Sequence, residues 1–317
     1  MVKSLITKLN SSINRTDLPI LDKIRINITG KSNSAQLSGI TGLITIVGSP
    51  LTWKGSGKCT INSNDNITFY INTDKNTKGL LYVDDKYNVT SIDTMWAHGV
   101  NVLFEDINKY CKNITTLYLG NSEQEGDLSV LKDLGKLVKI RVEGSKVTGD
   151  VAIFENILNL EVLDISKTSI ACDLSYFTNC TNLNFLNVMS TSTTGDLSAL
   201  VGIDKLENLN ATSSGVTGDL SLFAKKASLK IFNYWELLNT WNNDSLRPSN
   251  MSKITGAFGF ATSADTDNFL KNMAKCSDEG VENKTWYFQN SHRTSASDAA
   301  VSTLQSAGYT LSQLITD

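Results

Sequence analysis

The 317-residue sequence is poor in the residue types on which most catalytic and metal sites depend. It has two histidines, His98 and His292, and neither stands in a motif with a nucleophile or a metal-binding partner. Its five cysteines are odd in number and scattered, without a C-x-x-C pair, which argues against a disulfide framework and against a zinc site. We therefore expect a protein that is not an enzyme and that has no catalytic residue, cofactor or metal ion.

Charge and long hydrophobic runs are also scarce. Charged residues make up 19% of the chain and the net charge is −3, which argues against the basic surface that nucleic-acid binding needs. No run approaches the roughly 20 apolar residues of a membrane-spanning helix, and the N-terminus lacks the unbroken apolar segment of a signal peptide. We expect neither nucleic-acid binding nor membrane insertion. The three prolines, with abundant Asn, Ile and Lys, look like an AT-rich bacterial or phage coding bias.

What the chain has instead is a repeat with a constant 23-residue period (137 − 114 = 23). The pattern apolar-x-x-apolar-x-apolar starts at six equally spaced positions: Ile114, Leu137, Leu160, Leu183, Leu206 and Leu229. A second motif, close to Gly-Asp-Leu-Ser, recurs with the same period. Its aspartates are Asp127, Asp150, Asp173, Asp196 and Asp219. A fixed period of this length indicates a solenoid, in which each coil buries its apolar edge by stacking on its neighbours.

This pattern closely resembles the leucine-rich repeat family over residues 114–234, in the form seen in surface proteins of gut bacteria and their phages. The resemblance implies one short strand per coil, joined into a parallel sheet on the concave side. The family's usual Asn after the strand is replaced here by a column of hydroxyl residues: Ser122, Ser145, Thr168, Thr191 and Ser214. A hydroxyl both donates and accepts hydrogen bonds, so it can still satisfy the backbone where the chain turns away from the strand.

The aspartate column has two interpretations. Stacked coils would place the carboxylates about 5 Å apart, and such a ladder of oxygen atoms could hold calcium. Each aspartate also precedes a short turn whose backbone N–H groups its carboxylate can cap. Like charges at that spacing repel by only about 0.8 kcal/mol in water, so no cation is required. We predict capping.

The fold class that follows is α/β, a leucine-rich repeat solenoid with a small β-rich N-terminal domain and a helix-containing C-terminal cap. Residues 1–19 are expected to form an arm with an amphipathic helical pattern, which either folds back on its own domain or docks into a larger assembly. The expected divisions after the arm are a β-rich domain at 20–90, a cap of the solenoid at 91–113, the repeats at 114–236, and irregular C-terminal repeats with a cap at 237–317. In the last division, a short strand followed by a Ser/Thr/Asp helix start occurs twice.

The concave face is the predicted binding surface. Its outward middle column consists of Tyr118, Arg141, Asp164, Asn187, Asn210 and Asn233, with Phe185 and Trp235 beside it. Amide groups with an aromatic platform suit a glycan or a protein loop. The alternative is a polar strand surface that simply faces water.

These features together predict a non-enzymatic structural or adhesion protein of a phage virion, either a fibre or a capsid- or tail-attached protein. A solenoid without a secretion signal fits a particle assembled in the bacterial cytoplasm, and the arm and β-rich domain would dock it into that larger complex. Its partners would be other virion or surface proteins and a host glycan or protein receptor. The alternative is a bacterial leucine-rich repeat module that mediates protein interactions at the cell surface or inside the cell. A glycan-acting enzyme is the third hypothesis.

Overall fold

The computed structural model describes residues 24–29, 41–47, 51–56, 59–63, 68–73, 78–83, 89–96, 99–223, 226, 228–233, 240–241, 256–275 and 284–317. The predicted arm at 1–19, His98 and the candidate Trp235 lie outside these residues. The chain divides into two compact units, residues 1–126 and 127–317. No helix in the described part of the chain is both long and apolar enough to span a membrane.

The first unit consists mainly of two groups of strands. Its elements are β1 (Ile24–Thr29), β2 (Thr41–Val47), β3 (Leu51–Ser56), β4 (Cys59–Ser63), β5 (Thr68–Thr73), β6 (Lys78–Val83), β7 (Ser91–Asp93), β8 (Val100–Val102), α2 (Phe104–Tyr110) and β9 (Thr116–Tyr118). One group has the order β3-β6-β1-β8, and the other contains β9-β7-β2-β5-β4. The β1–β6, β1–β8, β3–β6, β2–β5, β4–β5 and β2–β7 pairs are antiparallel, whereas β7 and β9 are parallel.

The parallel pair shows that the first coil of the solenoid lies earlier than Ile114. Ile92 of β7 lies opposite Leu117 of β9, and both are fully buried. Because 117 − 92 = 25, this coil is two residues longer than the others and falls outside the 23-residue register. The segment that was expected to be a cap, 91–113, therefore contains a coil strand as well as the helix α2.

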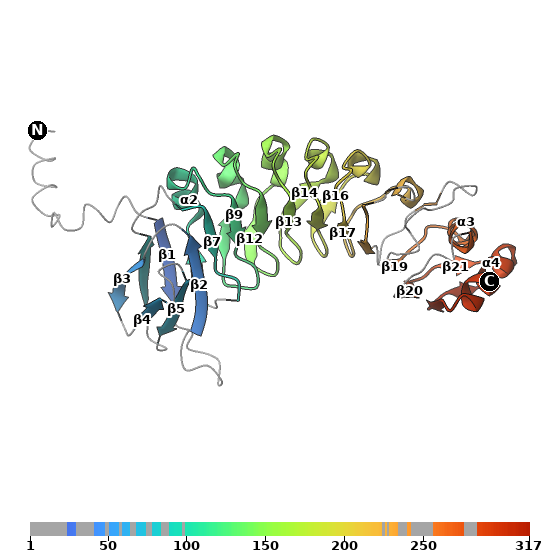
Figure 1. Cartoon of the computed structure of the whole chain (residues 1–317), viewed down its shortest axis with the longest axis horizontal. Helices are drawn as coiled ribbons and strands as arrows, with labels where there is room; N and C mark the ends of the chain where they lie inside the picture. Colours follow the sequence, from blue (N-terminus) through green and yellow to red (C-terminus); the bar gives the residue numbers. More distant parts are fainter. Residues whose placement is uncertain are drawn as a thin grey trace, which may run out of the picture. The chain divides into compact units, whose positions relative to one another are not determined.

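The second unit carries the regular coils. Its concave strands are β11 (Lys139–Arg141), β13 (Val162–Asp164), β15 (Phe185–Asn187), β17 (Asn208–Asn210) and β18 (Ile231–Asn233), and they are paired in this order. From β11 to β18 every pair is parallel and keeps the offset of the sequence repeat, since 162 − 139 = 23 for the first pair. The opposite side of each coil is a 3-10 helical turn (Figure 1): η3 (Leu128–Asp133), η4 (Val151–Asn156), η5 (Leu174–Phe177), η6 (Leu197–Leu200) and η7 (Leu220–Phe223). The predicted solenoid with a parallel sheet is confirmed.

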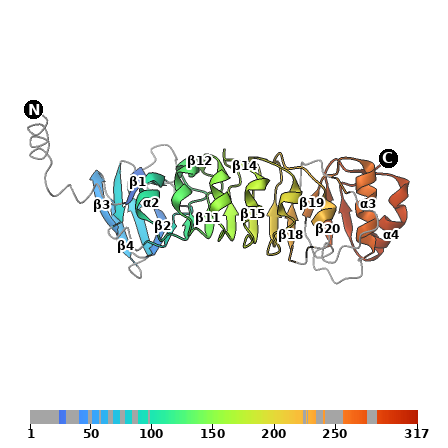
Figure 2. The same ribbon diagram turned by 90° about the horizontal axis from the view of Figure 1, so that it is seen from above.

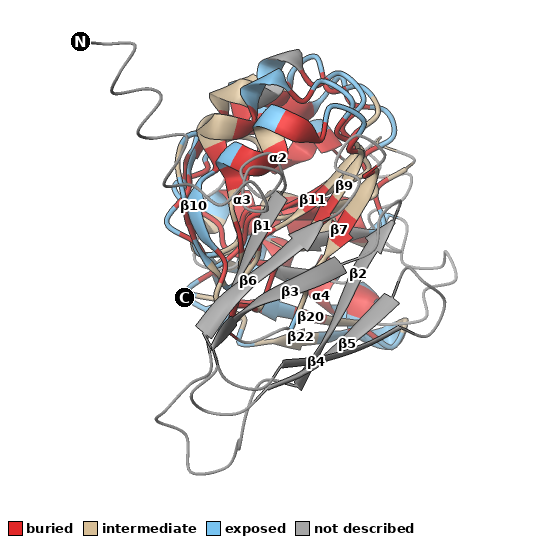
Figure 3. Ribbon diagram, turned by 90° about the vertical axis from the view of Figure 1, so that its left-hand side faces the viewer, coloured by how far each residue is buried: buried red, intermediate tan, exposed pale blue. Residues whose placement is uncertain are grey.

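The apolar repeat positions form the core of these coils. The leucines that open each pattern, Leu137, Leu160, Leu183 and Leu206, have no exposed surface. Figure 3 colours buried residues red, and the middle of β11 lies among them. Burial of one such side chain contributes about 1.5–3 kcal/mol, and each coil obtains it only from the coils on either side.

Short strands also line one flank of the coils: β10 (Glu125–Asp127), β12 (Lys146–Thr148), β14 (Ala171–Asp173) and β16 (Ser192–Thr194). Ala171 of β14 lies opposite Ser192 of β16, so the offset is 192 − 171 = 21 and not 23. Isolated bridges such as Asp196 to Thr217 keep the same offset. The pairing on this flank is therefore shifted by two residues relative to the concave strands, which brings Asp173 beside Thr194 and Asp196 beside Thr217.

The C-terminal coils contain full helices. Strands β19 (Gly256–Phe258), β20 (Thr285–Phe288) and β22 (Thr310–Ser312) form a parallel three-stranded sheet, and β21 (His292–Arg293) pairs with β23 (Ile315–Thr316). Helices α3 (Ser263–Ala274) and α4 (Asp298–Ser306) lie side by side (Figure 2), and η9 (Ser295–Ser297) precedes α4. Thr262 caps α3 by accepting a hydrogen bond from Asp265 N. This strand–helix alternation is the one predicted for the C-terminal part of the fold.

Candidate functional site

Three side chains in the middle column of the concave face stabilise turns, a role that the sequence analysis did not predict. Asp164 Oδ1 accepts a hydrogen bond from Ser166 N at 3.1 Å, and Asn187 Oδ1 accepts one from Met189 N at 3.3 Å. Asn210 Oδ1 accepts one from Thr212 N at 3.2 Å. An Asx side chain that bonds the backbone two residues later stabilises a turn. These three candidate binding residues thus close the ends of β13, β15 and β17.

Asp164 is further engaged within the protein. Its side chain is buried, and Oδ1 also accepts from Ser166 Oγ at 2.7 Å while Oδ2 accepts from Asn187 Nδ2 at 3.1 Å. A buried carboxylate is costly unless donors satisfy it, and three donor groups do so here. Asp164 is therefore held by its own coil and by the coil that follows.

Arg141 and Phe185 are candidates that the fold brings together. The guanidinium carbon of Arg141, on β11, lies 5.0 Å from the ring centroid of Phe185, on β15, so the side chain crosses β13. Such a cation–π contact contributes about 0.5–1 kcal/mol near the surface and fixes the direction of the guanidinium. Both side chains are half-buried and form one platform on the sheet.

The other candidate residues, Asn210, Asn233 and Tyr118, lie on other strands than Arg141 and Phe185. Asn210 Nδ2 lies 3.7 Å from Met189 Sδ, a weak acceptor, and Asn233 is half-buried at the paired position on β18. Tyr118 is half-buried on β9, in the first unit. The platform of the second unit therefore consists of Arg141, Phe185 and the amide groups of Asn210 and Asn233.

The hydroxyl column behaves as predicted. Each hydroxyl donates to the carbonyl three residues earlier at 2.5–2.6 Å, for Ser122, Ser145, Thr168, Thr191 and Ser214. Each also accepts from the backbone N–H two residues later at 3.2–3.4 Å. The residue just before each hydroxyl has a left-handed backbone, with φ between 51° and 62°. Ser and Thr thus provide both bonds that the turn away from the strand requires.

The aspartate column caps the 3-10 turns, as predicted. Oδ1 accepts from the backbone N–H two residues later at 2.8–2.9 Å in all five coils: Asp127, Asp150, Asp173, Asp196 and Asp219. Asp173 Oδ2 also accepts from Thr194 Oγ1 of the next coil at 3.1 Å. Hydrogen bonds from Ser175, through its side chain and backbone, and from Thr194 hold the pKa of Asp173 below its usual value. The described residues include no group of three His, Cys, Asp or Glu side chains that could bind a metal ion.

No family model and no curated protein matches the sequence. Among solved structures, PEPR1-AtPEP1 is similar with a TM-score of 0.51 and 16% identity, over 74% of this chain and 36% of that chain. The chain has the leucine-rich repeat fold.

The plant peptide hormone receptor RGFR1, in complex with RGF2, aligns with a TM-score of 0.46 and 15% identity, over 68% of this chain and 38% of that one. The leucine-rich repeat ectodomain of the receptor kinase SOBIR1 from Arabidopsis thaliana aligns with a TM-score of 0.35 and 13% identity, over 52% and 82%. This chain therefore spans little more than a third of the length of PEPR1 and RGFR1.

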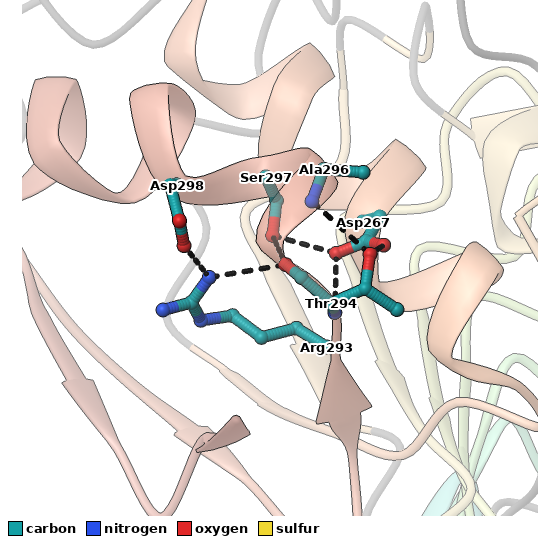
Figure 4. Close-up of polar contacts among 6 residues, drawn as sticks. All are labelled: Asp267, Arg293, Thr294, Ala296, Ser297 and Asp298. Carbon is teal, nitrogen blue, oxygen red and sulfur yellow. Dashed lines mark hydrogen bonds and ion pairs between the residues drawn. The ribbon is translucent and has the colours of Figure 1, made fainter. Parts of the chain in front are cut away.

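Polar groups also cluster beyond the regular leucine-rich repeats, around α3. Asp267 accepts hydrogen bonds from Thr294 N at 3.0 Å, Thr294 Oγ1 at 2.5 Å and Ser297 Oγ at 2.6 Å, while Arg293 pairs with Asp298 (Figure 4). The carboxylate of one coil thereby fixes the start of the next helix. This cluster has a structural role.

His292, which stands in no motif with a nucleophile or a metal-binding partner, is exposed. Its Nδ1 lies 2.5 Å from Asp317 Oδ1, and Asp317 Oδ2 accepts from Ser263 Oγ at 3.1 Å. In a nucleophilic triad the serine contacts the imidazole, whereas here it contacts the carboxylate. The three residues therefore link β21, β23 and the start of α3, and their arrangement does not activate the serine.

Proposed function

We propose that this chain is a binding protein, not an enzyme, and that its second unit holds an extended segment of a partner protein across the concave strands. The observation that carries this proposal is the Arg141–Phe185 platform, which lies beside amide groups whose oxygen atoms are engaged in turns. Arg141 and Asn210 bring N–H donors to this surface, through a guanidinium over the Phe185 ring and through an amide whose oxygen closes the turn. Such a surface favours ligands rich in acceptors, namely backbone carbonyls and carboxylates.

The fold supports this proposal. Parallel strands at leucine-rich repeat spacing set the outward side chains in rows about 4.8 Å apart, and their inward neighbours are fully buried and hold the rows in place. A rigid scaffold reduces the entropy lost when a side chain binds its ligand.

An array of immobilised peptides, with acidic, neutral and basic members, tests the proposal. We expect the wild-type protein to prefer acidic or carbonyl-rich peptides. Arg141→Ala and Phe185→Ala should weaken the best of them by about tenfold or more, which corresponds to about 1.4 kcal/mol. Lys132→Ala, which removes an exposed cation on the convex side, is the matched control and should bind as wild type does. Equal binding by wild type and both platform variants would contradict the proposal.

We further propose that this binding takes place on a phage virion, with the chain as a fibre or as a capsid- or tail-attached protein. An Asn-, Ile- and Lys-rich composition and the combination of a β-rich unit with a solenoid support this location. The partners would be other virion proteins and a host protein or glycan receptor. Purified phage particles should contain the protein at a fixed copy number. Recovery from host membrane or cytosol alone would favour the alternative, a bacterial surface or intracellular interaction protein.

A further inference from the structure

An exposed tryptophan occupies a turn of the first unit that the fold holds in an unusual backbone conformation. Trp96 is 64% exposed, more than any other large hydrophobic side chain in the described part of the chain, and its φ is 63°. The equivalent position in the next coil is Asn121, with φ 51°, and in the second unit it is Gly144, Lys167, Ser190 or Ser213. The turn requires a left-handed residue, and a bulky aromatic is poorly suited to that conformation. Neither folding nor local geometry accounts for tryptophan here.

The backbone under Trp96 is held rigidly. Trp96 N donates to Gly120 O at 3.2 Å, and Thr94 N donates to Tyr118 O at 2.7 Å. These bonds extend the β7–β9 pair and fix the turn to the following coil. An aromatic group on a fixed turn loses little entropy when it binds, which is the property of aromatic anchors in protein interfaces.

The strands β7 and β9 beside this turn carry two further side chains, those of Asp93 and Tyr118. Asp93 ends β7 and lies opposite Tyr118, which ends β9. Asp93 Oδ1 accepts from Met95 N at 3.0 Å, which directs the carboxylate toward the turn that carries Trp96. Burial raises the pKa of Asp93, because its half-buried carboxylate has lost part of its hydration. A partly dehydrated carboxylate with two aromatic side chains favours an organic cation, through charge attraction and cation–π contact.

We propose that Trp96, Tyr118 and Asp93 form a docking site for an arginine or lysine side chain of a partner protein. This site goes beyond the proposed function, because it belongs to the first unit and prefers a cation, whereas the platform of the second unit presents donors. Charge complementarity selects the occupant, because a neutral or acidic side chain would bring no positive charge to the Asp93 carboxylate.

The test uses the full-length protein and a short peptide with one central arginine, ¹⁵N-labelled in its guanidinium. Titration should shift or broaden the guanidinium signals in a saturable manner. The same peptide with citrulline, a neutral isostere, should not bind. Asp93→Asn and Trp96→Asn should each weaken binding by about fivefold or more. Trp96→Asn places the residue of the next coil in the turn, so its thermal midpoint should not fall.

Leu158→Asn is the matched control, because Leu158 is 55% exposed in the second unit, and it should bind the peptide as wild type does. Equal binding of the citrulline peptide, or no effect of Trp96→Asn, would overturn the proposal. Binding of a neutral oligosaccharide such as maltohexaose in place of the peptide would overturn it in favour of a glycan site. Tighter binding of choline than of the peptide would replace the protein partner with a small cation.

Discussion

Gly149 shows how closely adjacent coils approach each other at a single residue. Its φ is 113°, and a Cβ added there would lie 2.3 Å from Asp127 Oδ1 and 3.0 Å from Leu128 N. A side chain would therefore both strain the backbone and displace the carboxylate that caps η3.

We predict that Gly149→Ala lowers the free energy of unfolding by about 1–3 kcal/mol or more. Gly135→Ala is the matched control, because a Cβ there meets nothing within 4 Å, and its effect should stay within about 0.5 kcal/mol. Urea titration followed by circular dichroism measures both. Equal stability of the two variants would show that the coils separate easily at this point.

The hydrogen bonds of Asp173 make the stability of the protein depend on pH. Its pKa is lowered in the folded protein by bonds from Ser175 and Thr194, so its contribution to stability is present above the unfolded pKa and is lost as pH falls through the folded pKa. We predict that Asp173→Asn, which keeps a capping oxygen, reduces the loss of thermal midpoint between about pH 5 and about pH 2. The difference should be small because the carboxylate is partly exposed to solvent. Asp173→Ala should also lose about 1 kcal/mol at neutral pH. Identical acid profiles for wild type and Asp173→Asn would contradict the assignment.

At the scale of elements, each coil from β11 to β18 closes its own turns and pairs with its neighbours at the constant offset of the repeat. We predict that deletion of residues 183–205, one full period, leaves a folded protein with β13 paired to β17. A 22-residue deletion, 183–204, should fail to fold, because a shift of one residue turns the apolar side chains outward. Circular dichroism and thermal melting distinguish the two. If the variant that lacks residues 183–204 folds, the register of the apolar positions does not control how the coils stack.

The sequence predicted these regular elements because the apolar spacing and the turn residues agree in every coil. The constant 23-residue period starts at Ile114 and does not include the coil at Ile92, because that coil has two extra residues. Trp96 was missed for the same reason. The turn-forming role of Asn187 and Asn210 was missed because an asparagine on an outward strand position also suits a solvent-facing surface. An Asn or Asp at the end of four successive strands, β13, β15, β17 and β18, was the available signal.

For the molecule as a whole, the column of five aspartates raises the question of metal dependence. Their Oδ1 atoms already accept backbone N–H groups, so a cation would have to replace those bonds. We predict the same unfolding midpoint in calcium and in EDTA, since a ligand stabilises a protein only when it binds the folded state. Differential scanning calorimetry checks this, with magnesium as the control cation. A calcium-specific rise of several degrees would restore the interpretation of the column as a calcium site.

The middle column of concave strands has one more consequence. In Asn187 and Asn210 the side-chain oxygen accepts the backbone N–H that closes the turn, while the side-chain nitrogen donates to a group of the preceding coil. Asp164 fills the same place with a second oxygen instead of the nitrogen. A single exchange between asparagine and aspartate can therefore invert what a coil offers its neighbouring coil, from donor to acceptor, while the bond that closes its own turn is kept. The hydrogen bonds between neighbouring coils can therefore change by the exchange of one side-chain atom while the leucine-rich repeat fold stays the same.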